Sequence, residues 1–413
     1  MAAVGTASDR AERPGTEPGS PSNWAGVGSI AAGTFLLVTT EFLPIGLLSS
    51  LAADMQVTEG MAGLAVTAPG LVAAFAAPIL VLLARNTDRR TIVVALTLAI
   101  VASNVIAALA PNFTVFLAGR LVLGLAVGGL WAFAVAVGRR LVPDSAGARA
   151  TAIISAAISA GTVFGMPVGA VAGDWAGWRL VFAANAVLGL IVTVVQVSRL
   201  PPLPTAAGIG VGNIAAFAKI PMARIGLIAS AFVAAGHFIG YTFLEPYLRG
   251  TLSMDQTGIA LALTGYAVAG IAGSFAGERL AVRDVRSAFM AAANAVGATM
   301  IAAALSADTP AIAFVMVMAW GFAFGAVPVC VQIWMFTASP RLFEAGSALM
   351  VSAFQIALAA GAAIGGALVD TSGVVSAYLA GGVVCIAGAL IPVTLRPRAA
   401  PGISAPLASG DTQ

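Results

Sequence analysis

The sequence predicts an all-α membrane protein with twelve transmembrane helices in two bundles of six, and three observations support this prediction. First, 60% of the 413 residues are hydrophobic and 9% are charged, whereas about 25% of residues are charged in a soluble domain. Second, the chain contains twelve long apolar runs, and a helix needs about 20 apolar residues to cross a bilayer. Third, the basic residues between the runs are distributed unevenly. A water-soluble fold is excluded.

The twelve apolar runs are separated by charged residues or by Pro and Gly. Alternation with a period of two residues is absent, which argues against membrane β-strands. The expected helices of the first half cover about residues 24–51, 61–83, 91–110, 113–137, 149–172 and 179–198. Those of the second half cover about residues 224–248, 257–277, 287–306, 309–337, 345–368 and 374–395.

Polar segments divide the chain into five parts. Residues 1–23 are rich in Gly, Pro and Ser and lack the apolar core of a signal peptide, so we expect a disordered cytoplasmic tail. A six-helix bundle at 24–200 is joined to a second bundle at 224–396 by a Pro- and Gly-rich cytoplasmic linker at 201–223. A second cytoplasmic tail is expected at 397–413.

Basic residues predict the orientation of the helices. Seventeen of the twenty Lys and Arg residues fall in the tails or in the loops that follow even-numbered helices. Arg179 and Arg249 fall in the other loops, and Arg120 lies within the fourth helix. Because loops rich in Lys and Arg stay in the cytoplasm, both termini are predicted to be cytoplasmic.

The two halves of the chain resemble each other at a shift of 196 or 197 residues. In the fourth helix and the loop after it, Gly124, Gly128 and Pro143 recur as Gly321, Gly325 and Pro340. In the fifth helix and its following loop, Gly165, Gly169, Asp174 and Gly177 recur as Gly361, Gly365, Asp370 and Gly373. The two sets indicate a duplication, and parallel six-helix repeats around a central cavity are a known plan of transporters.

Glu41 lies deep in the first predicted helix. An ionisable side chain in the middle of a membrane is costly and usually faces a wet interior. We therefore expect Glu41 to bind protons or substrate. A structural hydrogen bond to a neighbouring helix, or exposure in a wet vestibule, is the alternative.

His237, Tyr241 and Glu245 are spaced at i, i+4 and i+8, so they are expected to share the cavity-facing side of the seventh helix. Histidine is the side chain best suited to titrate near neutral pH, so we assign His237 with Glu245 to proton coupling and Tyr241 to substrate binding. As alternatives, His237 is a buried hydrogen-bonding residue, and Pro246 and Arg249 favour a place for Glu245 at the outer interface.

Arg120 lies about 10 Å into its helix, at 1.5 Å per residue. It is expected to neutralise Glu41 in one state or to hold an anionic or carbonyl group of the substrate, and a fixed ion pair between helices is the alternative. Trp131, Trp320 and Phe354 could stack on a planar ring of the substrate. Their alternative role is packing in the core or against lipid.

Several segments carry a family resemblance. Residues 41–44 (EFLP), 87–90 (TDRR) and 120–143 resemble the major facilitator superfamily, and within it the drug and proton antiporter branch and its bacterial purine ribonucleoside efflux pumps. Residues 237–247 (HFIGYTFLEPY) are more similar to the sugar efflux transporters of the same branch. The resemblance covers nearly the whole chain outside the tails.

Three motifs of the superfamily are present in altered form. The loop between the second and third helices has Val81 and Arg85 where the family has Gly and Asp, so it lacks the usual acid. The fourth-helix motif begins at Arg120 and has Leu123 in place of the common Gln, and the fifth-helix exporter motif has Met166 between its Gly and Pro. The motif residues expected to serve conformational change are Arg89, Arg90, Gly124, Gly161, Gly165, Pro167 and Gly169.

The resemblance implies a secondary active transporter in the bacterial inner membrane. It would export a small organic molecule, nucleoside-like or sugar-like or an antibiotic, in exchange for protons by alternating access. In this branch a membrane-embedded acid of the first helix is commonly the coupling group, which here is Glu41. The alternative is an importer or uniporter of a small polar solute without proton coupling through Glu41.

Other classes of function find no support in the sequence. Phosphate-binding loops, zinc-protease motifs and nucleophile motifs are absent. The chain is therefore predicted not to be an enzyme or an ATP-driven pump, and no cofactor or metal is expected. The expected partners are a small-molecule substrate, protons and membrane lipids, and not nucleic acid, because the basic residues form no stripe. The chain is expected to be a monomer.

Overall fold

The structure, a computed structural model, describes residues 22–83, 87–204 and 211–394. Its described part contains helices and no strand, and twelve of the helices are long and apolar enough to cross a membrane. In the first half they are α1 (Trp24–Gly46), α4 (Leu64–Leu83), α5 (Arg89–Leu109), α6 (Phe113–Arg139), α7 (Gly147–Ala176) and α8 (Trp178–Arg199). In the second half they are α10 (Pro221–Tyr241), α12 (Gln256–Arg283), α13 (Val285–Leu305), α14 (Pro310–Ala338), α15 (Phe343–Ser372) and α16 (Val374–Thr394). The predicted all-α membrane fold is confirmed.

Short elements connect these spans. They are α2 (Leu48–Met55), α3 (Glu59–Ala62), the 3₁₀ turn η2 (Asp144–Ala146), α9 (Val211–Ala218), α11 (Leu244–Pro246), the π-helical turn η3 (Tyr247–Thr251) and the 3₁₀ turn η4 (Pro340–Leu342). The predicted tails lie outside the described residues, except for Ser22 and Asn23. Arg85 of the predicted loop motif and residues 205–210 of the predicted linker also lie outside them.

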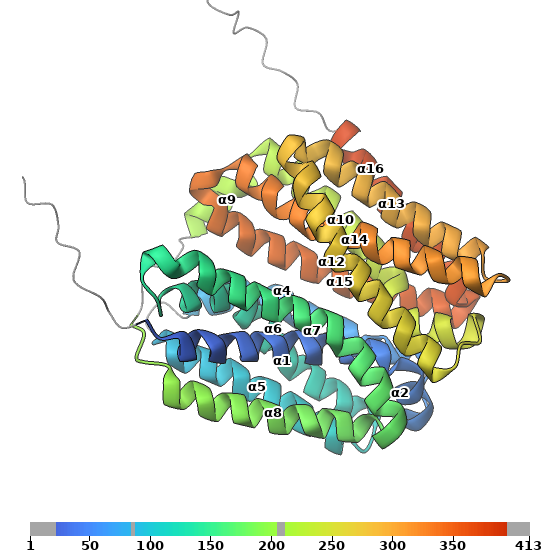
Figure 1. The fold of residues 1–413 in the computed structure, drawn as a ribbon, viewed down its shortest axis with the longest axis horizontal. Coiled ribbons are helices and arrows are strands. Elements are labelled where there is room, and N and C mark those ends of the chain that lie inside the picture. Colours follow the sequence, from blue (N-terminus) through green and yellow to red (C-terminus); the bar gives the residue numbers. More distant parts are fainter. Residues whose placement is uncertain (1–21, 84–86, 205–210, 395–413) are drawn as a thin grey trace, which may run out of the picture.

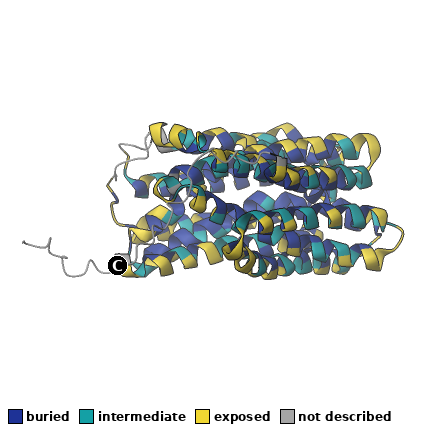
Figure 2. Ribbon diagram, turned by 90° about the horizontal axis from the view of Figure 1, so that it is seen from above, coloured by how far each residue is buried: buried dark blue, intermediate teal, exposed yellow. Residues whose placement is uncertain are grey.

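Two groups of helices form the molecule. Figure 1 shows the helices α1 to α8, which we call the N-half, in blue to green below the helices α10 to α16, the C-half, in yellow to red. Contacts between the halves are concentrated where α4 meets α15 and where α7 meets α12. The helices run roughly parallel to one another (Figure 2). Large apolar side chains such as Leu109, Trp175 and Leu305 are exposed, as expected for a surface in contact with lipid.

Side-chain caps set several helix starts. Asn23, Asn112 and Asp255 each accept a hydrogen bond from the backbone N–H three residues further on, at the starts of α1, α6 and α12. Such caps satisfy N–H groups that have no partner in the first helical turn. Gly177 and Gly373 end α7 and α15 with φ of 80° and 81°, a conformation that glycine adopts readily. Since these glycines occupy equivalent positions in the two repeats, the repeats share this backbone conformation as well as the sequence motif.

Close helix packing is repeated in the two halves as well. A Cβ atom on Gly124 of α6 would lie 2.7 Å from the carbonyl oxygen of Pro69 in α4. A Cβ atom on the equivalent Gly321 of α14 would clash with the carbonyl oxygen of Tyr266 in α12. Glycine therefore lets the fourth helix of each half approach the second helix of the same half.

The first span is shorter than the sequence predicts. The predicted helix at 24–51 ends as α1 at Gly46, and the chain continues as α2 and α3. Pro44 is the physical reason, because proline has no N–H for the helical hydrogen bond and its ring crowds the preceding turn. The break leaves α2 and α3 as short helices at the end of the bundle opposite the termini.

The seventh span is also shorter than predicted. The predicted helix at 224–248 ends as α10 at Tyr241, and α11 and η3 follow it. Pro246 cannot donate to the carbonyl of Thr242, so the helix does not continue in register. Glu245 consequently lies beyond the long helix, and the expectation that it shares one helical face with His237 and Tyr241 is wrong.

The linker is attached to both halves. At its start, the Leu203 backbone N–H donates to Asp88 Oδ2 over 2.8 Å, and the Arg89 N–H donates to the Leu203 carbonyl over 3.0 Å. Further on, Phe217 of α9 is fully buried and packs against Gly346 of α15. The predicted linker thus contains a helix, α9, that rests on the C-half.

Candidate functional site

The halves are joined at the end of the bundle opposite the termini, which we call the closed end. Asp370, near the end of α15, accepts hydrogen bonds from two groups at the start of α3: the Gly60 backbone N–H at 2.9 Å and the Thr58 hydroxyl at 2.7 Å. A carboxylate placed there also interacts favourably with the positive end of a helix. The C-half therefore caps a helix of the N-half.

A second carboxylate makes a similar contact. Glu245 is 1% exposed and accepts a hydrogen bond from the Ser49 backbone N–H, in the first turn of α2, over 3.1 Å. Its other oxygen pairs with Arg249 at 2.5 Å. Arg249 in turn bonds Gln256, which donates to the Ala170 carbonyl of α7 over 2.6 Å. Four hydrogen bonds thus join the halves at the closed end.

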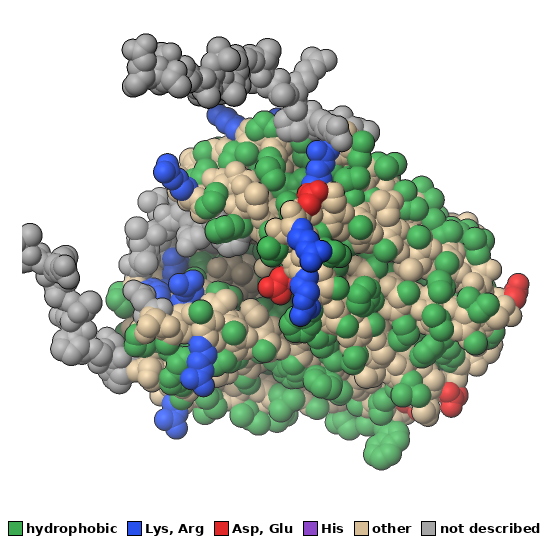
Figure 3. Space-filling model, turned by 45° about the horizontal axis from the view of Figure 1, so that its top comes forward, with side chains coloured by type: hydrophobic (Ala, Val, Ile, Leu, Met, Phe, Trp, Pro, Cys, Tyr) green, Lys and Arg blue, Asp and Glu red, His purple; other side chains and the backbone are tan. Residues whose placement is uncertain are grey.

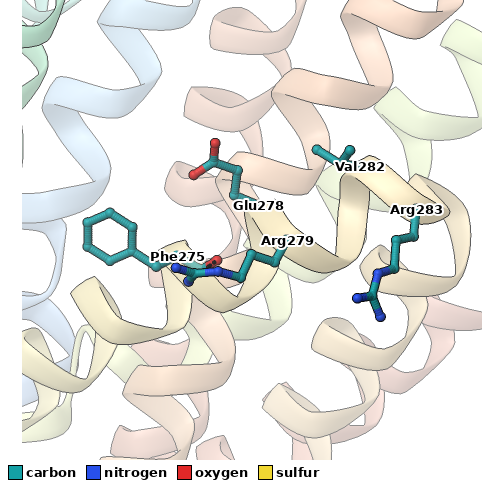
Figure 4. A pocket seen from close by; sticks show the side chains of 5 residues that line it. All are labelled: Phe275, Glu278, Arg279, Val282 and Arg283. Atoms are coloured by element: carbon teal, nitrogen blue, oxygen red, sulfur yellow. Dashed lines mark hydrogen bonds between the residues drawn. The ribbon is translucent and has the colours of Figure 1, made fainter.

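The opposite end, which carries the termini and which we call the open end, is hollowed between the halves. Figure 3 shows this hollow with Lys and Arg side chains around it. The last turns of α12 also carry a pocket of 410 Å³ lined by Phe275, Glu278, Arg279, Val282 and Arg283, and Figure 4 shows these side chains projecting from the one helix. A pocket lined by a single helix is a surface recess, and we assign it no role in binding.

Glu41 lies on α1 at the boundary between the halves. Its side chain is 2% exposed, and Oε1 accepts a hydrogen bond of 3.1 Å from Nε2 of Gln355 on α15. The second oxygen, Oε2, has no hydrogen-bond partner among the described residues. The indole of Trp131 on α6 lies beside the carboxylate. Three helices from both halves therefore surround this acid.

Arg120 is fully buried and binds the backbone of two neighbouring helices. Its Nε donates to the Ala65 carbonyl of α4 over 2.8 Å. Its Nη1 and Nη2 donate to the carbonyls of Thr40 and Glu41 in α1 over 2.9 and 3.0 Å. The guanidinium thus contacts the main chain of Glu41, and the expected ion pair with its carboxylate is absent from the described contacts in this conformation.

Prolines explain why Arg120 is needed at this place. In an α-helix each carbonyl accepts from the N–H four residues further on. The donors for the carbonyls of Thr40 and Ala65 would be residues 44 and 69, and both are proline, which has no N–H. Arg120 supplies the missing donor to each carbonyl and so holds α6 against α1 and α4.

His237 is held as a neutral imidazole. Trp320 Nε1 donates a hydrogen bond of 3.2 Å to His237 Nδ1, and a nitrogen that accepts carries no proton. The proton is therefore on Nε2, which has no partner among the described residues. Phe324 and Tyr241 stack on the two sides of the ring, with centroids 3.4 and 4.6 Å away. His237 could take a second proton only by giving up the Trp320 hydrogen bond.

The aromatic residues that were predicted to bind substrate differ in how far they are exposed. Trp320 is fully buried and Tyr241 is 4% exposed, so both belong to the core of the C-half in this conformation. Trp131 is 37% exposed, and Phe354 is half-buried with its ring edge against Phe238. Trp131 and Phe354 are thus the predicted stacking residues that stay partly exposed in this conformation.

The glycines of the fifth-helix motif lie where α7 crosses α1. A Cβ atom on Gly161 would lie 2.8 Å from the Phe35 carbonyl, and one on Gly165 would lie 3.1 Å from Thr39 Cα. Gly169 packs against Leu43 in the same way. Pro167 lies inside α7 between these contacts. The motif thus brings the backbones of α7 and α1 together along the segment of α1 that contains Glu41.

The basic pair of the loop motif lies at the open end. The guanidinium of Arg89 lies over the ring of Phe133, 4.7 Å from its centroid. Arg90 donates to the Val197 carbonyl of α8 over 2.6 Å. Both residues hold helices of the N-half together.

Sequence reasoning missed three residues that the structure brings into the site. Gln355 is an amide isolated in the apolar run of α15, and this isolation is a signal that could have found it. Asp370 was noticed as part of the repeat and was given no role. Phe324, which stacks on His237, had no signal, because aromatic residues are common in such runs.

The fold and this site define a membrane transporter, and comparisons with known proteins agree. The sequence profile of the Major Facilitator Superfamily matches residues 30–212 and 226–412. The chain belongs to this family, as the resemblance predicted. It is therefore a transporter of a small-molecule substrate and not an enzyme, and it is a multi-pass protein of the inner membrane.

Individual relatives are similar over nearly the whole chain. The purine ribonucleoside efflux pump NepI of Salmonella paratyphi B is 31% identical over 375 residues, which cover 91% of this chain and 94% of the relative. The protein of the same name in Salmonella enteritidis is 31% identical over 369 residues, which cover 89% of this chain and 93% of the relative.

Solved structures share the fold at low sequence identity. A D-xylose–proton symporter superposes with a TM-score of 0.73 at 17% identity, covering 91% of this chain and 98% of the symporter. A bacterial homologue of the lysosomal transporter Spinster superposes with a TM-score of 0.72 at 16% identity, covering 91% of this chain and 96% of the homologue.

Proposed function

We propose that this transporter exports a purine nucleoside or a similar small polar molecule in exchange for protons, by alternating access. The relatives named as purine ribonucleoside efflux pumps support the substrate class and the direction. The excess of Lys and Arg at the open end supports a cytoplasmic location of that end and of both termini. In this orientation the conformation described here is closed to the outside and open to the cytoplasm.

The observation that carries the proposal is the position of Glu41. It is a buried carboxylate at the boundary between the two halves, within reach of both. A group that couples proton movement to alternating access has to be reachable from one side at a time. Glu41 would take up a proton from the outside and release that proton toward the cytoplasm. These two steps would alternate with binding and export of the substrate.

The remaining predicted residues take supporting roles in the proposal. Trp131, beside Glu41, and Phe354, the sequence neighbour of Gln355, are the stacking residues for a purine. Arg120 contributes its positive charge. Glu245 is paired with Arg249 at the closed end and helps to hold that end shut. This leaves Glu41 as the main coupling acid. The bundles at 24–200 and 224–396 move as units within a monomer surrounded by lipid.

The energy available from protons is sufficient for export. One proton that moves through 100 mV releases about 2.3 kcal/mol. Since 1.36 kcal/mol corresponds to a factor of ten, this sustains a gradient of about 50-fold for a neutral solute.

The proposal is tested in everted membrane vesicles whose interior has been acidified by respiration. Adenosine added to the medium should enter the lumen in exchange for protons. The fluorescence of a dye that reports the pH gradient should then recover in vesicles that contain the protein and stay quenched in vesicles that lack it. Uptake of adenosine without any movement of protons would contradict the exchange mechanism.

A first variant tests the closed end. In Asp370→Ala, the Gly60 N–H and the Thr58 hydroxyl lose their acceptor, and each bond is worth about 0.5–1.5 kcal/mol, or more when the acceptor is charged. We expect spin labels on Ser50 and Thr371, which are both exposed, to report a larger population of long distances than in the protein with native Asp370.

Asp174 provides a matched control. It is equivalent to Asp370 under the repeat but is exposed, and it has no described contact across the halves. Asp174→Ala should therefore leave the label distances unchanged. Equal effects of the two substitutions would show that Asp370 does not hold the closed end.

A further inference from the structure

Glu41 and Gln355 form a pair with two unused acceptors. Their hydrogen bond joins the halves within the spans, whereas the four other bonds between the halves, among the residues that the structure describes, lie at the closed end. Both side chains are 2% exposed. Glu41 Oε2 and Gln355 Oε1 have no hydrogen-bond partner among the described residues. Buried polar atoms are nearly always paired, so these two oxygens call for donors from outside the chain.

Two donors of the chain near these oxygens are already engaged. Arg120 directs three N–H bonds to the carbonyls of Thr40, Glu41 and Ala65. Gln355 Nε2 is used by Glu41 itself. The indole N–H of Trp131 lies near the Glu41 carboxylate but outside hydrogen-bond geometry. The two acceptors therefore remain open to a bound molecule that brings its own N–H or O–H groups.

Aromatic rings flank the two acceptors. Trp131 lies beside the Glu41 carboxylate and is 37% exposed. Phe354, the neighbour of Gln355 in sequence, is half-buried. Phe42, the neighbour of Glu41, stacks parallel to Phe238 at 6.3 Å and is half-buried as well. A planar ring fits such surroundings better than a flexible chain does.

We propose that Gln355 and Glu41 together form a recognition site, spanning the two halves, for a planar ring that carries a pair of hydrogen-bond donors on one edge. Gln355 is thereby a specificity-determining residue. This inference rests on the proposed function, because it places the substrate between the halves. It goes further by stating which groups on the edge of the ligand ring the site selects. Exocyclic amino groups and ring N–H groups are bound. Rings that carry only acceptors are rejected, since they would leave both oxygens unpaired.

The test compares probes with and without donors on the purified protein by equilibrium dialysis. The first pair is guanosine, whose ring N1–H and 2-amino group lie on one edge, and purine riboside, which lacks both donors. The second pair, which is independent of ribose, is 2-aminobenzimidazole and 1-methylbenzimidazole, at a pH where both are neutral. In the wild-type protein the donor-bearing member of each pair should bind about tenfold more tightly or better.

Substitutions then test whether Glu41 and Gln355 cause this preference for probes with donors. Gln355→Leu should reduce the preference to about twofold or less, because it removes one of the two acceptors and, with it, the cost of leaving that acceptor unpaired beside a donor-free probe. Glu41→Gln, which replaces one acceptor oxygen with a donor, should reduce the preference too and serves if Gln355→Leu does not fold. The control is Gln332→Leu, which removes an exposed glutamine from α14 and should keep the wild-type preference.

The outcomes separate this site from the proposed function. If Gln355→Leu keeps the preference for donors, or if the wild-type protein binds no donor-bearing probe because water alone occupies the acceptors, the recognition site is wrong. If the benzimidazole preference depends on Gln355 but neither riboside binds, the site stands and nucleosides are the wrong substrate. If adenosine is transported but the preference for donor-bearing probes does not depend on Gln355, the proposed function stands and the recognition site is wrong.

Discussion

Arg120→Leu is expected to be among the most destabilising substitutions in this protein. The side chain is fully buried and supplies the hydrogen bonds that Pro44 and Pro69 withhold from the carbonyls of Thr40 and Ala65. A buried carbonyl without a donor costs about 1–3 kcal/mol. Two such carbonyls, together with the lost packing, predict a loss of about 3 kcal/mol or more, measured by thermal unfolding in detergent.

A rescue experiment makes this explanation specific. Pro44→Ala and Pro69→Ala each restore a backbone N–H to the helix, so in the Arg120→Leu background they should recover part of the lost stability. In the wild-type background they should have little favourable effect. The interaction between the sites is read from a double-mutant cycle.

Arg279 serves as the control arginine because it is exposed at the open end of α12. Arg279→Leu should change the unfolding temperature little. If both arginine substitutions cost the same, or if the alanines give no rescue, Arg120 does not act by serving the proline-freed carbonyls.

The second large effect is expected for Glu41→Gln on proton coupling. Glutamine has nearly the shape of glutamate, and its Oε1 can still accept the hydrogen bond from Gln355, so the fold should persist. It cannot exchange a proton at neutral pH. Accumulation of adenosine driven by a pH gradient in everted vesicles should therefore be abolished.

Counterflow distinguishes lost coupling from lost transport. Exchange of labelled for unlabelled substrate needs no net movement of protons, so Glu41→Gln should retain it. The control is Glu278→Gln, an exposed carboxylate on α12, which should keep both activities. Gradient-driven accumulation by Glu41→Gln at the wild-type level would mean that another group, such as Glu245 or His237, carries the proton.

Much of the fold could be predicted from the sequence, because membrane spans depend on composition and length. The twelve spans and the duplication follow from apolar runs, basic loops and glycines such as Gly177 and Gly373. The ends of α1 and α10 were misplaced, although Pro44 and Pro246 were visible, because a proline can kink a span as well as end it. The apolar runs continue through both breaks.

The site was less predictable, because its contacts depend on how distant helices meet. Glu41 and Arg120 were found as charges in apolar runs, which is a local signal. That Arg120 contacts carbonyls on two other helices requires their packing and cannot be read from spacing. Gln355 is 314 residues from Glu41, and its isolation in an apolar run marks it as unusual without showing which helix it meets.

The helix caps that cross between the halves at the closed end have an energetic consequence. When this end separates, Ser49 N–H, Gly60 N–H and the carboxylates of Glu245 and Asp370 become hydrated, and water replaces each lost bond at small net cost. Exchange with water therefore limits the share of these polar contacts in the free-energy difference between the two conformations to about 0.5–1.5 kcal/mol for each bond. The apolar cluster of Leu48, Ala52, Ala62 and Phe243 at the same end also has to be exposed, and differential binding of cargo or protons shifts the equilibrium.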